Sequence, residues 1–173
     1  MKQTQPLPKS PETLGPVRQW QVEWEWVGQK IHLRTAEDAV TVSDKEGSEV
    51  EAAPELIESA LSLPPGTCLE GVLTSGDCQH IMIWDCTEFL GADLRTMPLY
   101  ARQLQAFPMV GSLDSPFFRT SEPLQITSWD QAEKILSPPL PLHTQGWVIK
   151  KTDGVYQEEG PDDTWWTLVH CKP

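Results

Sequence analysis

The chain has 173 residues, 39% hydrophobic and 22% charged, which is enough to fold around a hydrophobic core. Its formal net charge is −12 with only 13 Lys and Arg residues, which argues against nucleic acid as a direct, tight ligand. No stretch approaches the roughly 18 apolar residues of a membrane helix, and no apolar run opens the chain. We therefore expect a cytoplasmic protein with no membrane partner.

Four cysteines stand at positions 68, 78, 86 and 171 without any closely spaced pair. Structural zinc sites draw their ligands from short Cys and His spacings, which this sequence lacks. The spacing predicts reduced, buried thiols and no metal site.

Residues 1–16 are rich in proline and polar residues, a composition typical of disorder, so we expect one folded domain over 17–173. Alternating residues predict strands over 17–27, 29–35 and 39–44. Gly28 separates the first two of these strands.

In the middle of the chain, segments with helical spacing of apolar residues alternate with segments predicted to be strands. Helical spacing of apolar residues follows Pro54 and ends at Pro64 and Pro65, and it recurs over 97–107. Strands are predicted over 66–75 and 79–89, joined by a turn.

Ser128, followed by Gln131, forms a capping-box pattern for a helix over 129–136. Strands are predicted over 145–152 and 164–172. Because helices are inserted between antiparallel strands rather than between parallel ones, the order predicts an α+β fold.

Five segments of this chain resemble, in order, the motifs of the adenylation domain of ATP-dependent DNA ligases, a member of the covalent nucleotidyltransferase superfamily. They are "VEWEWVGQK", "PELIESALSLPPGTCLEGVL", "IMIWDCTEFLGADLRTMPLYAR", "QGWVIKKTDGVY" and "TWWTLVHCKP". The resemblance covers residues 20–173. It implies an ATP-grasp-like nucleotidyltransferase domain of antiparallel sheets flanked by helices. The OB domain that follows it in ligases is expected to be absent here.

In that family a lysine attacks the α-phosphate of a nucleotide, assisted by cations and carboxylates. The resemblance places Glu25 at the lysine's position and Val27 at that of the motif's aspartate, while Lys30 stands in for its arginine. A carboxylate here would repel the triphosphate, since two like charges about 4 Å apart raise the free energy by roughly 1 kcal/mol in water and by more in a cleft. The strand that carries the lysine nucleophile in that family therefore carries an acid in this chain.

The other motifs lose their reactive groups in the same way. Glu70 keeps an acid, but Val72 replaces the catalytic glutamate and Gln145 replaces a metal-binding acid. Thr167 and Val169 occupy the two lysine positions of the last motif. The resemblance thus implies a degenerate, catalytically inactive domain that binds another protein as a scaffold in nucleic-acid repair or processing.

Several matching positions remain for binding or for structure. Trp84 lies where the family has an aromatic that stacks on the purine, although burial in the core is the simpler interpretation. Lys150 could meet a phosphate, and Asp93 with Arg95 could form an ion pair at a turn.

Two alternatives stay open. Lys30 or Lys150 could serve as a relocated nucleophile in an active minimal ligase, or the chain could bind a nucleotide or cap without a covalent step. We expect no bound cofactor, with ATP as the weaker alternative.

Overall fold

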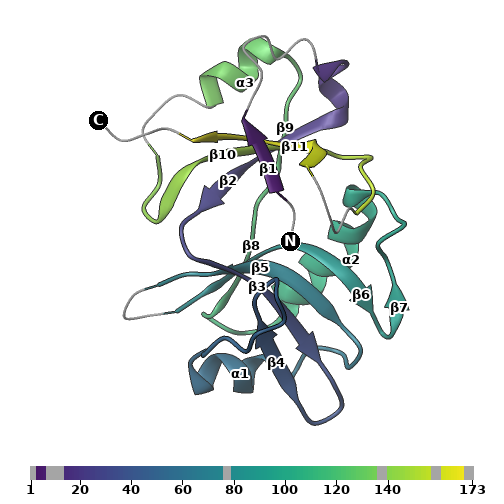
Figure 1. Ribbon diagram of the computed structural model, residues 1–173, viewed down its shortest axis with the longest axis vertical. Coiled ribbons are helices and arrows are strands. Elements are labelled where there is room, and N and C mark those ends of the chain that lie inside the picture. The colour runs from purple at the N-terminus through teal and green to yellow at the C-terminus, as the bar shows by residue number, and fades with distance from the viewer. Residues whose placement is uncertain (1–2, 7–13, 76–78, 136–139, 157–160, 170–173) are drawn as a thin grey trace. The chain divides into compact units, whose positions relative to one another are not determined.

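The computed structural model describes residues 3–6, 14–75, 79–135, 140–156 and 161–169 (Figure 1). Its internal contacts divide the chain into two compact units. Unit 1 combines residues 1–27 with residues 122–173, and unit 2 is the continuous segment 28–121. Unit 1 is thus built from the two ends of the chain.

Unit 1 is a five-stranded sheet with strand order β1-β11-β10-β2-β9. Its elements are β1 (Gln3–Pro6), a 3-10 helix (Val17–Gln19), β2 (Trp20–Trp26), β9 (Leu124–Gln125), α3 (Trp129–Ile135), β10 (Thr144–Lys151) and β11 (Pro161–Val169). β10 lies antiparallel between β2 and β11, and β1 runs parallel to β11. β1 lies within residues 1–16, of which the structure describes 3–6 and 14–16.

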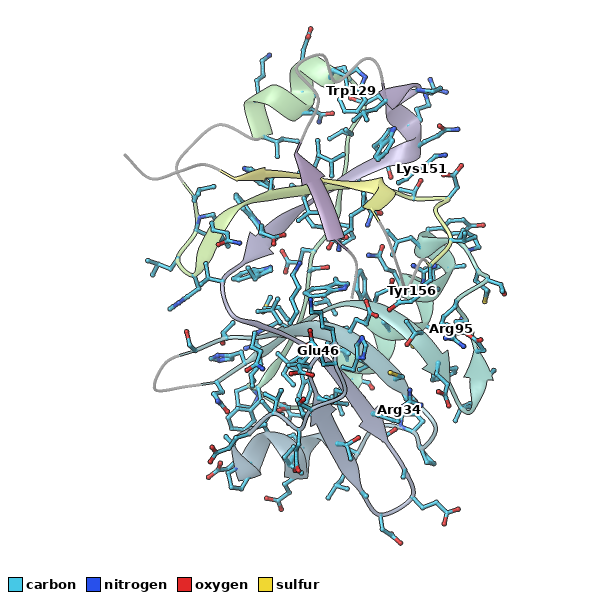
Figure 2. All side chains as sticks on the ribbon, viewed as in Figure 1. Arg34, Glu46, Arg95, Trp129, Lys151 and Tyr156 are labelled. Carbon is cyan, nitrogen blue, oxygen red and sulfur yellow. The ribbon has the colours of Figure 1, made fainter. Side chains whose placement is uncertain are left out.

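The core of unit 1 lies on one face of this sheet. Period-two alternation places Trp20, Val22 and Trp24 of β2 on that face. They pack with Trp147 of β10, whose ring stacks on Trp24. Trp129 of α3, labelled in Figure 2, packs against the same cluster. This packing explains why the strand is so rich in tryptophan.

The cap of α3 matches the sequence prediction in part. Ser128 Oγ accepts a hydrogen bond from the backbone N–H of Gln131 at 3.1 Å, as an N-cap should. The Gln131 side chain accepts from the N–H of Thr127 at 2.7 Å. The Gln131 side chain of the capping box therefore binds Thr127, the residue before the N-cap, rather than Ser128 itself.

Unit 2 is a sheet with strand order β4-β3-β5-β6-β7, in which β8 also pairs with β6. Its elements are β3 (Gln29–Thr35), β4 (Val40–Ser43), α1 (Pro54–Ala60), β5 (Cys68–Leu73), β6 (Ile81–Phe89), β7 (Ala92–Asp93), α2 (Leu99–Ser112) and β8 (Phe118–Thr120). Apart from the parallel β6–β8 pair, the strand pairs of this sheet are antiparallel. The expected α+β class is confirmed.

The core of unit 2 lies on one face of the sheet. Ile31, Leu33 and Leu69 belong to one buried cluster with Leu56 of α1 and Ala106 of α2. Because strand residues alternate between faces, the polar residues between these apolar ones occupy the opposite face.

A buried ion pair joins α2 to β6. Arg102 Nε and Nη2 each donate to one Asp85 oxygen at 2.7 Å, and both side chains are fully buried. Arg102 also donates to the carbonyl of Met97. A bidentate pair with further hydrogen bonds fixes the position of the helix on the strand.

α2 is longer than predicted. It continues past Phe107 to Ser112, with Pro108 inside it. No helix in the described part of the chain combines the length and the apolar character needed to cross a membrane.

Candidate functional site

The polar face of unit 1 carries the position that the resemblance assigns to the nucleophile. Since Trp24 points to the core, its neighbours Glu23 and Glu25 lie on the opposite face of β2. In the register with β10, Glu23 stands opposite Val148 and Glu25 opposite Gly146. Two carboxylates thus follow each other along this face.

Lys150 of β10 reaches the first of these carboxylates. Its Nζ lies 2.7 Å from Glu23 Oε2, and Gln21 Nε2 donates to the other oxygen at 2.8 Å. Lys150 is only 2% exposed and Glu23 1% exposed. The amine predicted to meet a phosphate is therefore engaged in a buried ion pair.

The remaining predicted positions of unit 1 lie around this face. The backbone of Val27, just after β2, donates to the carbonyl of His143 at 2.8 Å. Gln145 is exposed at a shift in the β2–β10 register.

On β11, Thr167 stands opposite Val148 and Val169 opposite Gly146. The register therefore aligns Glu25, Gly146 and Val169 in one row across three strands. Glu25 and Val169, two positions that the resemblance assigns to chemistry, therefore lie in one row of this sheet although they are far apart in the sequence.

The predicted residues of unit 2 lie on the polar face of its sheet. Lys30 of β3 stands opposite Val72 of β5, which is buried. Glu70 is paired with Asp85, and the next pair joins Gly71 to Ile83, so Trp84 is the extra residue of a β-bulge. Bulges redirect side chains, and here the indole is directed to Glu70.

Glu70 is the centre of a polar cluster that sequence reasoning identified only in part. Its Oε1 lies 3.2 Å from His32 Nε2, and its Oε2 accepts from Trp84 Nε1 at 3.4 Å. Glu70 is 1% exposed and Trp84 7% exposed. The sequence analysis missed His32, although the alternation of Lys30, His32 and Arg34 could have indicated it.

Arg34, farther along the same strand, binds Glu88 instead. Arg34 Nη1 donates to Glu88 Oε2 at 2.6 Å, near the ends of β3 and β6. Arg34 is labelled in Figure 2. Both side chains keep contact with solvent, so this pair adds little to stability.

Gly28 has a steric reason to be glycine. A Cβ built at this position would lie 2.3 Å from the carbonyl oxygen of Leu73 and 2.5 Å from a methyl of Val72. Only a residue without a side chain allows β3 to approach β5 so closely here.

The predicted ion pair at the turn after β7 is confirmed. Arg95 donates from Nη2 and Nε to the two Asp93 oxygens at 2.8 and 2.9 Å, and its backbone N–H donates to Oδ1. These hydrogen bonds from Arg95 lower the pKa of Asp93 to about 2. The pair is exposed, and its role is to shape the turn.

Comparison with known proteins rests on structure alone. No family model matches the sequence, and no curated protein matches it either. The structure is similar to a Lig E DNA ligase, with a TM-score of 0.70 and 10% identity over 98% of this chain and 69% of that one.

Two further similar structures are ligases. A mycobacterial DNA ligase D complexed with ATP and MES has a TM-score of 0.70 and 16% identity, covering 98% of this chain and 59% of that one. The ligase domain of LigD from M. tuberculosis has a TM-score of 0.65 and 18% identity, covering 88% and 54%. The chain thus spans between about half and two thirds of these ligase structures. The resemblance stated from the motifs is confirmed at the level of the fold: this chain has the fold of a DNA ligase nucleotidyltransferase domain.

Proposed function

We propose that this chain is a ligase-like nucleotidyltransferase module that does not form a covalent nucleotide adduct and that acts as a binding or scaffold module in nucleic-acid repair or processing. The observation that carries the proposal is the polar face of β2 and β10. There a carboxylate, Glu25, stands at the position of the family's lysine. The lysine of the neighbouring strand, Lys150, is bound to Glu23.

The contacts of Lys150 and the side chain at position 72 support this proposal. Attack on a phosphate needs an amine that presents a lone pair, whereas Lys150 donates its hydrogen to a carboxylate 2.7 Å away. Moving that amine to a substrate would leave Glu23 buried without its cation, which is costly. The valine at position 72 also has no group that could bind a ribose hydroxyl or a metal ion.

The direct test is incubation of the full chain with α-labelled ATP or GTP, with and without Mg²⁺, followed by a denaturing gel. We expect no labelled protein, while a Lig E DNA ligase run in parallel becomes labelled. The Glu25→Lys variant asks whether the missing amine alone restores labelling. A covalent label on the natural chain, lost in Lys150→Met or Lys30→Met, would identify an active enzyme with a relocated nucleophile.

A non-covalent nucleotide binder is the second candidate, because the bulge at Trp84 directs its indole to Glu70 on the polar face of unit 2. A ligand that binds only the folded state raises the free energy of unfolding, by about 2.7 kcal/mol at a hundred times its dissociation constant. Thermal unfolding with millimolar ATP, GTP or a cap analogue would show this gain, and Trp84→Leu would remove it. If none of these nucleotides raises the unfolding temperature of the natural chain, this candidate is excluded.

A further inference from the structure

One side of α2 presents apolar side chains to solvent. Tyr100 is 52% exposed and Leu104 65% exposed, and both Pro108 and Ser112 are exposed as well. These four residues follow each other at intervals of four, so they form one row along the helix, which we call the α2 row. Met97, which lies outside the helix three residues before Tyr100, is 36% exposed.

This side of α2 differs from an ordinary solvent-facing helix surface. A surface helix usually carries charged residues on its outer side. The only charged residue in the α2 sequence is Arg102, and it is fully buried against Asp85. In a chain of net charge −12, 14 residues without an exposed charge form a conspicuously neutral surface.

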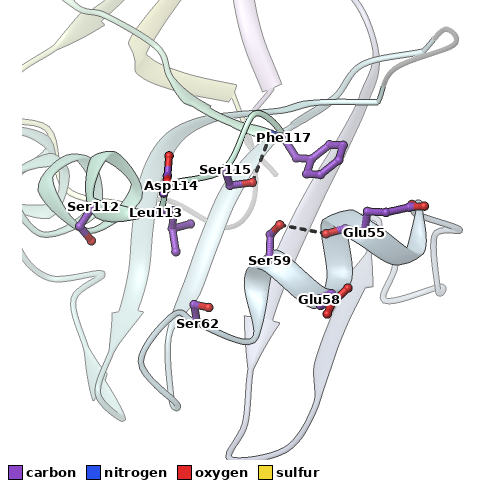
Figure 3. Close-up of a pocket in the computed structure, with 9 residues that line it drawn as sticks. All are labelled: Glu55, Glu58, Ser59, Ser62, Ser112, Leu113, Asp114, Ser115 and Phe117. Atoms are coloured by element: carbon purple, nitrogen blue, oxygen red, sulfur yellow. Dashed lines mark hydrogen bonds between the residues drawn. The ribbon is translucent and has the colours of Figure 1, made fainter.

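The α2 row ends at an acidic hollow. Ser112, the last residue of the row, lines a hollow of 560 Å³ between α1 and the segment that follows α2 (Figure 3). Three acidic residues, Glu55 and Glu58 of α1 and Asp114, are among the residues that line it. Glu55 and Glu58 belong to an acidic segment, residues 37–58, that contains eight carboxylates and one lysine.

We propose that the α2 row and the acidic hollow together dock an amphipathic helix of another protein, with apolar residues at i, i+4 and i+7 and a cluster of Lys or Arg at one end. The apolar residues pack on Tyr100 and Leu104, and the basic end lies in the hollow. This inference rests on the proposed function, because it names the partner of a binding module.

Charge argues against a second copy of this chain as the occupant. Two molecules of charge −12 repel each other, and the acids beside the row would face acids. A basic partner adds electrostatic attraction that a second copy lacks.

The test uses the full chain and a fluorescein-labelled helical peptide of about 20 residues, with leucines at i, i+4 and i+7 and a C-terminal run of lysines. Fluorescence anisotropy measures its binding to the natural chain and to three variants. Leu104→Glu disrupts the row, and Glu55→Gln with Glu58→Gln neutralises the hollow. Leu142→Glu, at an 85% exposed leucine of unit 1, is the matched control. Circular dichroism checks that each variant is folded.

We expect Leu104→Glu to weaken binding about tenfold or more, and the control to change nothing. Neutralising the hollow should weaken binding several-fold at low salt, and this difference should disappear at about 0.3 M salt. A peptide with glutamates in place of the lysines should bind weakly.

Three results would overturn the proposal. They are no binding to the natural chain, equal binding by Leu104→Glu, and self-association in sedimentation that Leu104→Glu abolishes. None of them bears on nucleotide labelling, so this inference and the proposed function can fail separately.

Discussion

Each unit of this molecule buries an ion pair, and the two pairs stand in different settings. Asp85 and Arg102 of unit 2 form a bidentate pair that attaches α2 to β6 from within. Lys150 Nζ of unit 1 lies 2.7 Å from Glu23 Oε2, on the sheet face that also carries Glu25. The first pair joins a helix to a strand, and the second joins neighbouring strands.

The comparison teaches which ligase-like residues this chain retains. Asp85 and Arg102 match the ligase motif "IMIWDC…PLYAR", and the structure gives them a packing role. Gly28 matches too, and its lack of a side chain is required by close contact with β5. The replaced positions, by contrast, are those that the resemblance assigns to chemistry. Under the function proposed above, the retained residues are those that hold the fold together.

The largest expected effect is the loss of the bidentate pair. Arg102→Ala leaves Asp85 buried without its cation and should cost about 3–5 kcal/mol of unfolding free energy. Urea unfolding measures this cost. The exposed Arg95→Ala variant serves as the control and should change stability little. An unchanged unfolding midpoint for Arg102→Ala would mean that this pair does not secure α2.

Lys150→Met should cost somewhat less, about 3 kcal/mol, because an ammonium cannot make the bidentate pair that Arg102 makes with Asp85. The double variant Glu23→Gln with Lys150→Met should recover part of that loss, since no buried charge remains unpaired. A double-mutant cycle by urea unfolding gives the coupling energy, expected at about 1–3 kcal/mol. A coupling near zero would show that the two side chains act independently.

Gly28→Ala should destabilise the chain by about 1–3 kcal/mol, because the new methyl overlaps the Leu73 carbonyl. Gly111→Ala is a matched control within α2, where an added Cβ meets nothing within 4 Å. That control should be neutral or stabilising by up to about 1 kcal/mol, as expected for alanine in a helix. Equal midpoints in thermal unfolding for the two variants would contradict the steric role of Gly28.

The smallest effect concerns the exposed Asp93–Arg95 pair. The pKa of Asp93 is lowered to about 2 from 3.8, so its contribution is present above about pH 4 and is lost as the pH falls towards 2. Arg95→Ala should return the pKa to its ordinary value. Carbon-detected NMR titration of the Asp93 carboxyl measures both values, and an unchanged pKa in the variant would exclude Arg95 as the cause.

Much of the fold could be predicted from local sequence patterns. The alternation in β2 and β3 and the N-cap at Ser128 all have a physical cause within a few residues. The 3.6-residue spacing that predicts α2 also has a local cause, but its continuation beyond Pro108 was missed because proline usually ends a helix.

The sites were harder to predict, because they depend on pairing between distant strands. The partners Glu23 and Lys150 are 127 residues apart in the sequence, and only the register of β2 with β10 brings them together. The bulge that directs Trp84 to Glu70 leaves no sign in composition or periodicity. His32 was missed for the same reason, since its partner lies on another strand.

The division of the chain into an inserted unit and an interrupted one has a consequence for biosynthesis. Residues 28–121 leave the ribosome as one continuous stretch, so unit 2 can reach its native pairing while translation continues. β2 must wait for β10, more than a hundred residues later, before it can gain its central neighbour. Until β10 is made, Trp20 and Trp24 lack the Trp147 against which they pack in the folded protein, so we expect this strand to expose apolar surface during synthesis.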